Sequence, residues 1–201
     1  MTDLERALAD IAEVRERLGH VQRFKGYSGF AAAMSGAFAV AAGVLQLAVV
    51  PRVASAHEGH LYFAIWFACC AASILINYGA IAHWYVNDAS ARDRWQTATV
   101  GLAILPALVL GASLSFALLR ANLYAFMPGV WFGCYGVGLL ASRTMLPRNV
   151  VFIAAAFMLA GMGLLFVPAG IALAWWILPC GFGLGQLAIG ACIMRERTVR
   201  R

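Results

Sequence analysis

Six long stretches without charged residues dominate this sequence. Each runs for about twenty residues or more, and Asp, Glu, Lys and Arg occur only at the ends of the stretches. A helix needs about 20 mainly apolar residues to cross the hydrocarbon core of a bilayer. The alternating strands of a transmembrane barrel are not visible. The predicted spans are 27–50, 61–86, 96–119, 122–142, 149–168 and 171–194.

The overall composition agrees with this prediction. Of the 201 residues, 63% are hydrophobic and only 12% are charged, whereas about 25% of the residues of soluble proteins are charged. We therefore predict an all-α integral membrane protein with six transmembrane helices over residues 27–194. Its main partner is the lipid bilayer.

The basic residues predict how the spans are oriented. Lys and Arg gather on the cytoplasmic side of membrane proteins. With the N-terminus inside, thirteen of the fifteen basic residues fall in cytoplasmic segments, and only Arg52 and Arg120 fall outside. Both termini, including a basic tail over residues 195–201, are therefore expected in the cytoplasm. The net charge of +6 then reflects topology rather than nucleic-acid binding, and the Arg- and Ala-rich composition favours a bacterial inner membrane.

Residues 1–26 form a polar segment with the pattern of a cytoplasmic amphipathic helix. Thr2 and Glu5 make a capping box at its start. Apolar residues then recur at spacings of three and four, as in a short coiled-coil seam. The seam is carried by Leu4, Ile11, Val14 and Leu18, with Ala7 and Val21 between and after them.

The charges on this segment favour contact with protein over contact with lipid. Residues 1–17 hold five acids and three arginines, whereas helices that lie on membranes are usually rich in Lys and Arg. Two alternatives stay open. The seam packs on this protein's own cytoplasmic loops, or it docks another membrane or cytoplasmic protein or a second copy of the chain.

Two glycine-rich stretches, "PGVWFGCYGVGLLASR" and "PCGFGLGQLAIGACIMRER", raise the question of phosphate binding. A phosphate-binding loop needs a lysine at a fixed place, and neither stretch contains one. Glycines four residues apart instead allow two helices to approach closely in lipid. We predict this packing role for Gly129, Gly133, Gly136, Gly181 and Gly185.

The same stretches suggest an internal repeat. Residues 135–141 align with residues 182–188, and residues 78–82 are a weaker third copy. The six helices are therefore interpreted as three hairpins. Pro106, Pro128 and Pro179 are each expected within a helix, where proline removes a backbone hydrogen bond.

Few polar side chains fall inside the predicted spans. His83 is the only ionisable residue of the usual catalytic types there, and no carboxylate enters the membrane. His57, Glu58 and His60 lie in an outer loop but lack the further ligands of a zinc site. The sequence thus predicts no catalytic centre, metal or cofactor. The residues expected to line a cavity, if there is one, are Asn77, Pro179 and Gln186.

Residues 97–193, together with "FKGYSG" before the first span, resemble a group of small six-helix bacterial inner-membrane proteins. The resemblance rests on "MPGVWFGCYGVGLLASRTMLPR", "AAAFMLAGMGLLF" and "LPCGFGLGQLAIGACI". It implies six spans and a cytoplasmic N-terminus, and it implies no activity.

These features together favour a protein that is not an enzyme. We expect an accessory, assembly or regulatory subunit that docks through its N-terminal helix. The alternative is a small-solute transporter or channel built from three helical hairpins.

Overall fold

The computed structural model describes residues 28–87, 89–143 and 149–199, and these residues form helices and no strands. The predicted docking residues Leu4, Ile11, Val14 and Leu18 lie outside the described residues. The long helices are α2 (Gly29–Val49), α3 (Ala56–Asn87), α4 (Ala91–Arg120), α5 (Met127–Ala141), α6 (Val150–Leu164) and α8 (Leu184–Val199). Three short elements are the 3-10 turn η1 (Tyr124–Phe126), α7 (Ala169–Ala172) and the π-turn η3 (Pro179–Gly183).

Four helical segments of the described part are long and apolar enough to cross a membrane. They are α2, α3, residues Gly101–Arg120 of α4, and the continuous stretch Tyr124–Ala141. The prediction of an all-helical protein is confirmed for the described residues, and so is the prediction of several helices long and apolar enough to cross a membrane. Helix α6 is apolar but only 15 residues long. Helix α3 has 32 residues, or about 48 Å at 1.5 Å per residue, so its ends extend beyond a hydrocarbon core of about 30 Å.

The sixth predicted span differs from the structure at its start. The sequence predicts a helix from residue 171, but residues 173–176 are not helical and regular helix resumes at Ile177. Pro179 lies in the first turn of the resumed helix, and Pro128 lies in the first turn of α5. Proline is favoured there because the first backbone N–H groups of a helix have no partner in any case. All three prolines were expected within helices at the loss of a backbone hydrogen bond; Pro106 lies inside α4, whereas Pro128 and Pro179 lie at helix starts, where no such bond is lost.

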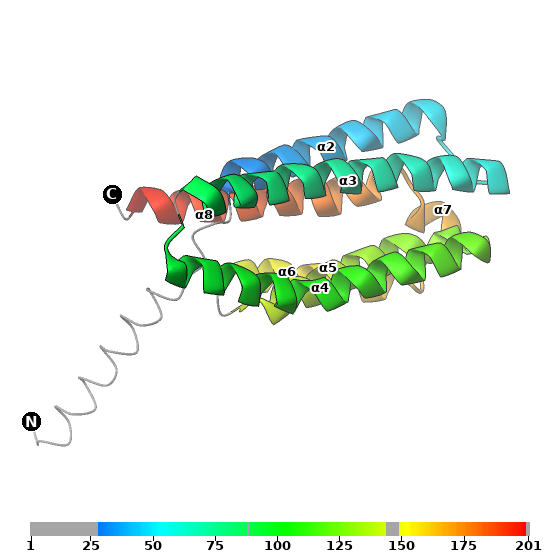
Figure 1. Ribbon diagram of the computed structural model, residues 1–201. Helices are drawn as coiled ribbons and strands as arrows, with labels where there is room; N and C mark the ends of the chain where they lie inside the picture. Colours follow the sequence, from blue (N-terminus) through cyan, green and yellow to red (C-terminus); the bar gives the residue numbers. More distant parts are fainter. Residues whose placement is uncertain (1–27, 88, 144–148, 200–201) are drawn as a thin grey trace, which may run out of the picture.

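The helices form two groups of three (Figure 1). In the first group, α2 lies between α3 and α8, and in the second group, α5 lies between α4 and α6. Where the two groups meet, α3 makes few contacts with α4, and α8 makes few contacts with α6. The first two predicted hairpins are packed pairs, but the third is not. The segment between α6 and α8 crosses from the second group to the first, so α8 packs on α2 rather than on α6.

Glycines on both helices allow α2 and α8 to approach closely. Gly29, Gly36 and Gly43 are seven residues apart and lie on one face of α2. A methyl group on Gly29 would be 2.9 Å from the carbonyl oxygen of Gly190, and one on Gly36 would be 2.8 Å from that of Gly183. No side chain fits there. The contact therefore depends on small residues, as helix pairs in lipid commonly do.

The second group contains a similar contact between α5 and α6. A methyl group on Gly136 would lie 2.8 Å from the carbonyl oxygen of Ala154, and one on Gly129 would lie 3.0 Å from that of Gly161. The added carbon at Gly133 would meet nothing within 4 Å, although the Gly133 backbone itself lies against Gly161. The predicted glycines of α5 thus differ in how closely they are packed, because Gly129 and Gly136 have no room for a side chain, whereas Gly133 has open space beside it.

The remaining two predicted packing glycines contact rings rather than backbone. The ring of Phe132 lies over Gly181, and the ring of Phe157 lies 2.5 Å from the place where a side chain on Gly185 would begin. The third copy of the proposed repeat does not share this packing. Tyr78 is 48% exposed, and a methyl group on Gly79 would meet nothing within 4 Å.

Candidate functional site at the junction of the two helix groups

An aromatic cluster fills the junction between the second group and α8. Phe132 and Tyr135 of α5, Phe157 of α6 and Phe182 of η3 lie with neighbouring ring centroids 4.9 to 5.3 Å apart. Gln186 reaches into this cluster and donates a 2.5 Å hydrogen bond from Nε2 to the Tyr135 hydroxyl. Its Oε1 atom is buried and has no hydrogen-bond partner among the described residues. A buried acceptor without a partner is rare in proteins.

A second polar contact ties the crossing segment to the first group. Gln46 is buried in α2, its Nε2 donates to the carbonyl oxygen of Leu173 at 2.9 Å, and its Oε1 accepts from Trp66 Nε1 at 2.8 Å. Leu173 lies where the helix is interrupted, so its carbonyl needs a partner from elsewhere. Both the Nε2 donor and the Oε1 acceptor of the Gln46 amide therefore have hydrogen-bond partners within the protein.

Other polar groups near the helix centres are paired in the same way. Asn77 of α3 donates from Nδ2 to Ser35 Oγ of α2 at 2.6 Å. Trp131 of α5 donates from Nε1 to Ser115 Oγ of α4 at 2.7 Å. The Trp131 ring also stacks on Tyr62 of α3 at 6.2 Å between centroids. The Tyr62 hydroxyl, like Gln186 Oε1, is buried and has no hydrogen-bond partner in the part of the chain that the structure describes.

The residues predicted to line a cavity are not brought together. Asn77 bonds to Ser35, Gln186 lies in the aromatic cluster, and the ring of Pro179 packs against Gly43 of α2. None of the three lines either of the two cavities described below. A path along them remains a prediction.

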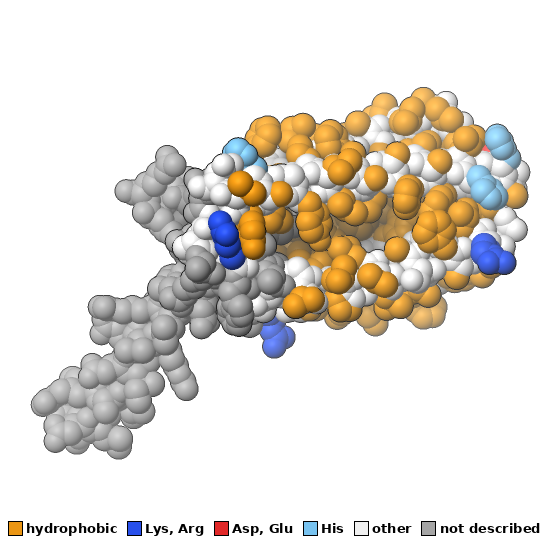
Figure 2. Space-filling view, viewed as in Figure 1, with side chains coloured by type: hydrophobic (Ala, Val, Ile, Leu, Met, Phe, Trp, Pro, Cys, Tyr) orange, Lys and Arg blue, Asp and Glu red, His pale blue; other side chains and the backbone are white. Residues whose placement is uncertain are grey.

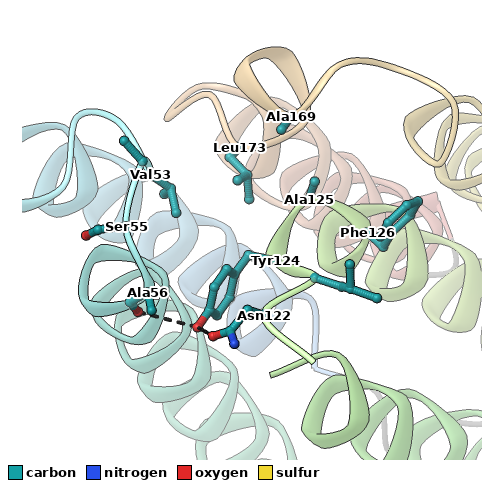
Figure 3. A pocket seen from close by; sticks show the side chains of 11 residues that line it. Val53, Ser55, Ala56, Asn122, Tyr124, Ala125, Phe126, Ala169 and Leu173 are labelled. Carbon is teal, nitrogen blue, oxygen red and sulfur yellow. Dashed lines mark hydrogen bonds between the residues drawn. The ribbon is translucent and has the colours of Figure 1, made fainter. Parts of the chain in front are cut away.

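The larger cavity, of about 350 Å³, lies at the end of the junction where α3 begins and α5 begins (Figure 3). Its wall comes from both groups and from the crossing segment. The lining residues are Val53, Ala54, Ser55, Ala56, Asn122, Leu123, Tyr124, Ala125, Phe126, Ala169 and Leu173.

Tyr124 joins the two groups beside this cavity. Its buried ring lies directly over Gly59 of α3, where any side chain would overlap it. Its hydroxyl donates to Asn122 Oδ1 at 2.7 Å and lies 3.4 Å from the Ala56 carbonyl oxygen and 3.2 Å from His60 Nδ1 (Figure 3). Asn122 has a φ of 56°, a left-handed conformation that Asn adopts more readily than most residues.

The first turn of α3 is held by a capping box that extends the helix five residues before the predicted span. Glu58 Oε2 accepts from the N–H groups of Ala54 and Ser55, each at 2.8 Å, and the Glu58 N–H donates to Ser55 Oγ at 3.3 Å. The hydrogen bond from Ala54, followed by those from Ser55, holds the pKa of the Glu58 carboxyl below its usual value. The pattern Ser-x-x-Glu in the sequence could have predicted this start.

The smaller cavity, of about 210 Å³, is an apolar hollow among α4, α5 and α6. Gly129, Gly133 and Gly161 contribute to its wall, together with larger side chains such as Leu110 and Met162. It explains the space beside Gly133. The one side chain in its lining with a reactive group is Cys134, a free thiol.

Two of the three histidines in the described residues, His60 and His83, form hydrogen bonds with nearby residues of α3. His60 Nδ1 lies 2.6 Å from the Ala56 carbonyl oxygen, and His83 lies 3.1 Å from the amide nitrogen of Asn87. Within residues 28–87, 89–143 and 149–199, no three His, Cys, Asp or Glu side chains are placed to bind one metal ion.

No family model, curated protein or solved structure matches this chain. The resemblance to small six-helix inner-membrane proteins therefore stays a prediction.

Proposed function

We propose that this chain is a six-span protein of the bacterial inner membrane that acts as an accessory, assembly or regulatory subunit and has no catalytic activity of its own. One observation carries the proposal. Polar side chains within the long helices, such as Gln46, Asn77 and Ser115, form hydrogen bonds with other residues of the same chain. The helical part is thus a scaffold held together from within, to which residues 1–26 add an amphipathic segment for docking whose first 17 residues carry more acids than bases.

The distribution of charge supports a cytoplasmic location for that segment. α2 begins and α8 ends at the same end of the molecule, and charged and histidine side chains gather at the two ends (Figures 1 and 2). Among described residues, Arg94, Arg143 and Arg195 belong to this end, and Arg52 and Arg120 to the other. The end with more Arg and Lys faces the cytoplasm in most membrane proteins.

The proposal is tested with a double substitution in the N-terminal seam. Ile11→Asp with Leu18→Asp places two charges at seam positions, where an unpaired buried charge costs several kcal/mol, roughly the size of a modest interface. Ala9→Asp with His20→Asp, on the opposite side of the same heptad pattern, is the matched control. We expect the seam variant to insert normally and to lose its partner in native gels and pull-downs from the source membrane. Retention of every partner by the seam variant would refute the docking role.

A second candidate, a small-solute transporter or channel, is favoured by the division into two groups. The central helices α2 and α5 run in opposite directions (Figure 1). Many transporters are built from two inverted sets of helices that hold the solute between them. Gln186 Oε1 is an unpaired acceptor at such a junction. Swelling of proteoliposomes in urea or glycerol gradients distinguishes the candidates, because only a transporter accelerates it above empty liposomes.

A further inference from the structure

The cavity of about 350 Å³ beside Tyr124 has the position and size of a ligand site. Sites for small molecules commonly lie between helices or at the junction of two packed units, with volumes of about 300–1,000 Å³. This cavity lies between the two helix groups, and the crossing segment contributes Ala169 and Leu173 to its wall (Figure 3). A bound molecule would therefore contact all three parts at once.

The lining determines which chemistry fits. All eleven lining residues are uncharged, and eight of them are Val, Ala, Leu or Phe. Ser55 Oγ donates to the Glu58 carboxylate, and the Tyr124 hydroxyl donates to Asn122 Oδ1. That bond fixes the amide of Asn122 with its oxygen on Tyr124, so its nitrogen is the side-chain group that remains to donate. None of the lining side chains offers an ion an opposite charge.

We propose that this cavity binds a small, uncharged, partly apolar molecule that enters from the outer aqueous side and accepts a hydrogen bond from Asn122. The site is independent of the subunit role. Its failure would leave the docking role of residues 1–26 untouched, and loss of the docking role would leave the site in place.

Thiol labelling tests the proposal in detergent-solubilised full-length protein whose five native cysteines are replaced by alanine. Leu173→Cys places a thiol in the wall, where the native side chain is only 6% exposed. Arg52→Cys, in the exposed loop at the same end, is the control. N-ethylmaleimide, which is uncharged, is compared with a sulfonated maleimide that carries the same reactive group, so the thiol's own reactivity cancels from the ratio.

We expect N-ethylmaleimide to label both positions and the sulfonated reagent to label Leu173→Cys at least about tenfold more slowly than Arg52→Cys, because the charged group must be desolvated. Ala169→Trp, which adds a large side chain at the wall, should abolish labelling of Leu173→Cys. The proposal is overturned if N-ethylmaleimide does not reach Leu173→Cys, or if both reagents label it equally well.

Binding, as distinct from access, is tested with cyclohexanol as the probe. Its apolar ring and single hydroxyl fit the proposed chemistry. It should slow labelling of Leu173→Cys at concentrations that leave Arg52→Cys unaffected, and Asn122→Gly, which tolerates the same φ, should weaken this protection. Equal slowing at both positions would exclude a site. Loss of all labelling at Leu173→Cys in phosphatidylcholine nanodiscs would show that lipid occupies the cavity and would also overturn the proposal.

Discussion

Gln46 and Leu173 are 127 residues apart in sequence and are joined by a 2.9 Å hydrogen bond from the amide of one to the carbonyl of the other. The bond connects α2 to the segment that crosses between the two helix groups. It supplies a partner for a carbonyl that no helix satisfies. The interruption before η3 and the buried glutamine of α2 therefore depend on each other.

Gln46→Leu should destabilise the protein by about 1–3 kcal/mol, because it leaves the Leu173 carbonyl and the Trp66 N–H without partners. Thermal unfolding in detergent measures the effect. Leu47→Met, at the next position on the exposed side of α2, is the control and should melt like the parent. A Gln46→Leu protein as stable as the control would mean that water or lipid reaches these groups.

Two tyrosine-to-phenylalanine substitutions should change the stability of the protein in different directions. Tyr62→Phe removes a buried hydroxyl that has no partner and keeps the ring on Trp131, so we expect unchanged or higher stability, by up to about 1 kcal/mol. Tyr124→Phe removes the bond to Asn122 and should lower stability by about 1 kcal/mol. Melting temperatures of the two variants, measured side by side, check the signs. A clear loss of stability in Tyr62→Phe would reveal a partner for its hydroxyl.

Gly133 of α5 and Gly161 of α6 face each other, so the effect of adding one methyl group can be compared at the two positions. In Gly161→Ala, the new carbon would lie 2.5 Å from the Gly133 nitrogen, so the helices must separate at a cost of about 1–3 kcal/mol or more. In Gly133→Ala, the new carbon enters the apolar cavity and should cost little. Expression level and thermal unfolding measure both. Similar behaviour of the two variants would show that the close contact does not determine stability.

The proposed topology predicts the location of reporter fusions. Fusions after Arg201 and after Phe24 should report the cytoplasm, and a fusion at Gly59, in the first turn of α3, should report the periplasm. The expectation follows from the excess of Arg and Lys at the end where α2 begins. A periplasmic signal from the Arg201 fusion is incompatible with an even number of spans after a cytoplasmic N-terminus.

The sequence predicts where helices lie better than it predicts which helices touch. The span predicted over 27–50 corresponds to α2 at Gly29–Val49, and that over 122–142 corresponds to the helical stretch Tyr124–Ala141. Hydrophobicity determines such limits, because a span ends where polar residues begin. The partner of each helix is not encoded in this way, because spans in lipid are apolar on nearly every face. The seven-residue spacing of Gly29, Gly36 and Gly43 in α2, matched by Gly183 of η3 and Gly190 of α8, was a signal for this pairing.

The candidate site was harder to predict. Gln186 stands out as a polar residue in an apolar helix, and the structure places it at the junction. Tyr124 and Asn122 do not stand out, because a tyrosine and an asparagine near a span end are expected at any membrane surface. Their role comes from the left-handed turn at Asn122 and from the absence of a side chain at Gly59, and both depend on how the two groups meet.

The packing of α8 on α2 has a consequence for biogenesis. Chains emerge from the ribosome N-terminus first, so α4, α5 and α6 are all synthesised before α8 and can assemble with one another early. α2 and α3 enter the bilayer first, yet the glycine face of α2 stays uncovered until the last helix is released. During translation, Gly29, Gly36 and Gly43 therefore remain uncovered and accessible to other proteins of the membrane. A ribosome that stalls before residue 177 leaves a product in which the glycine face of α2 lacks its contact with η3 and α8.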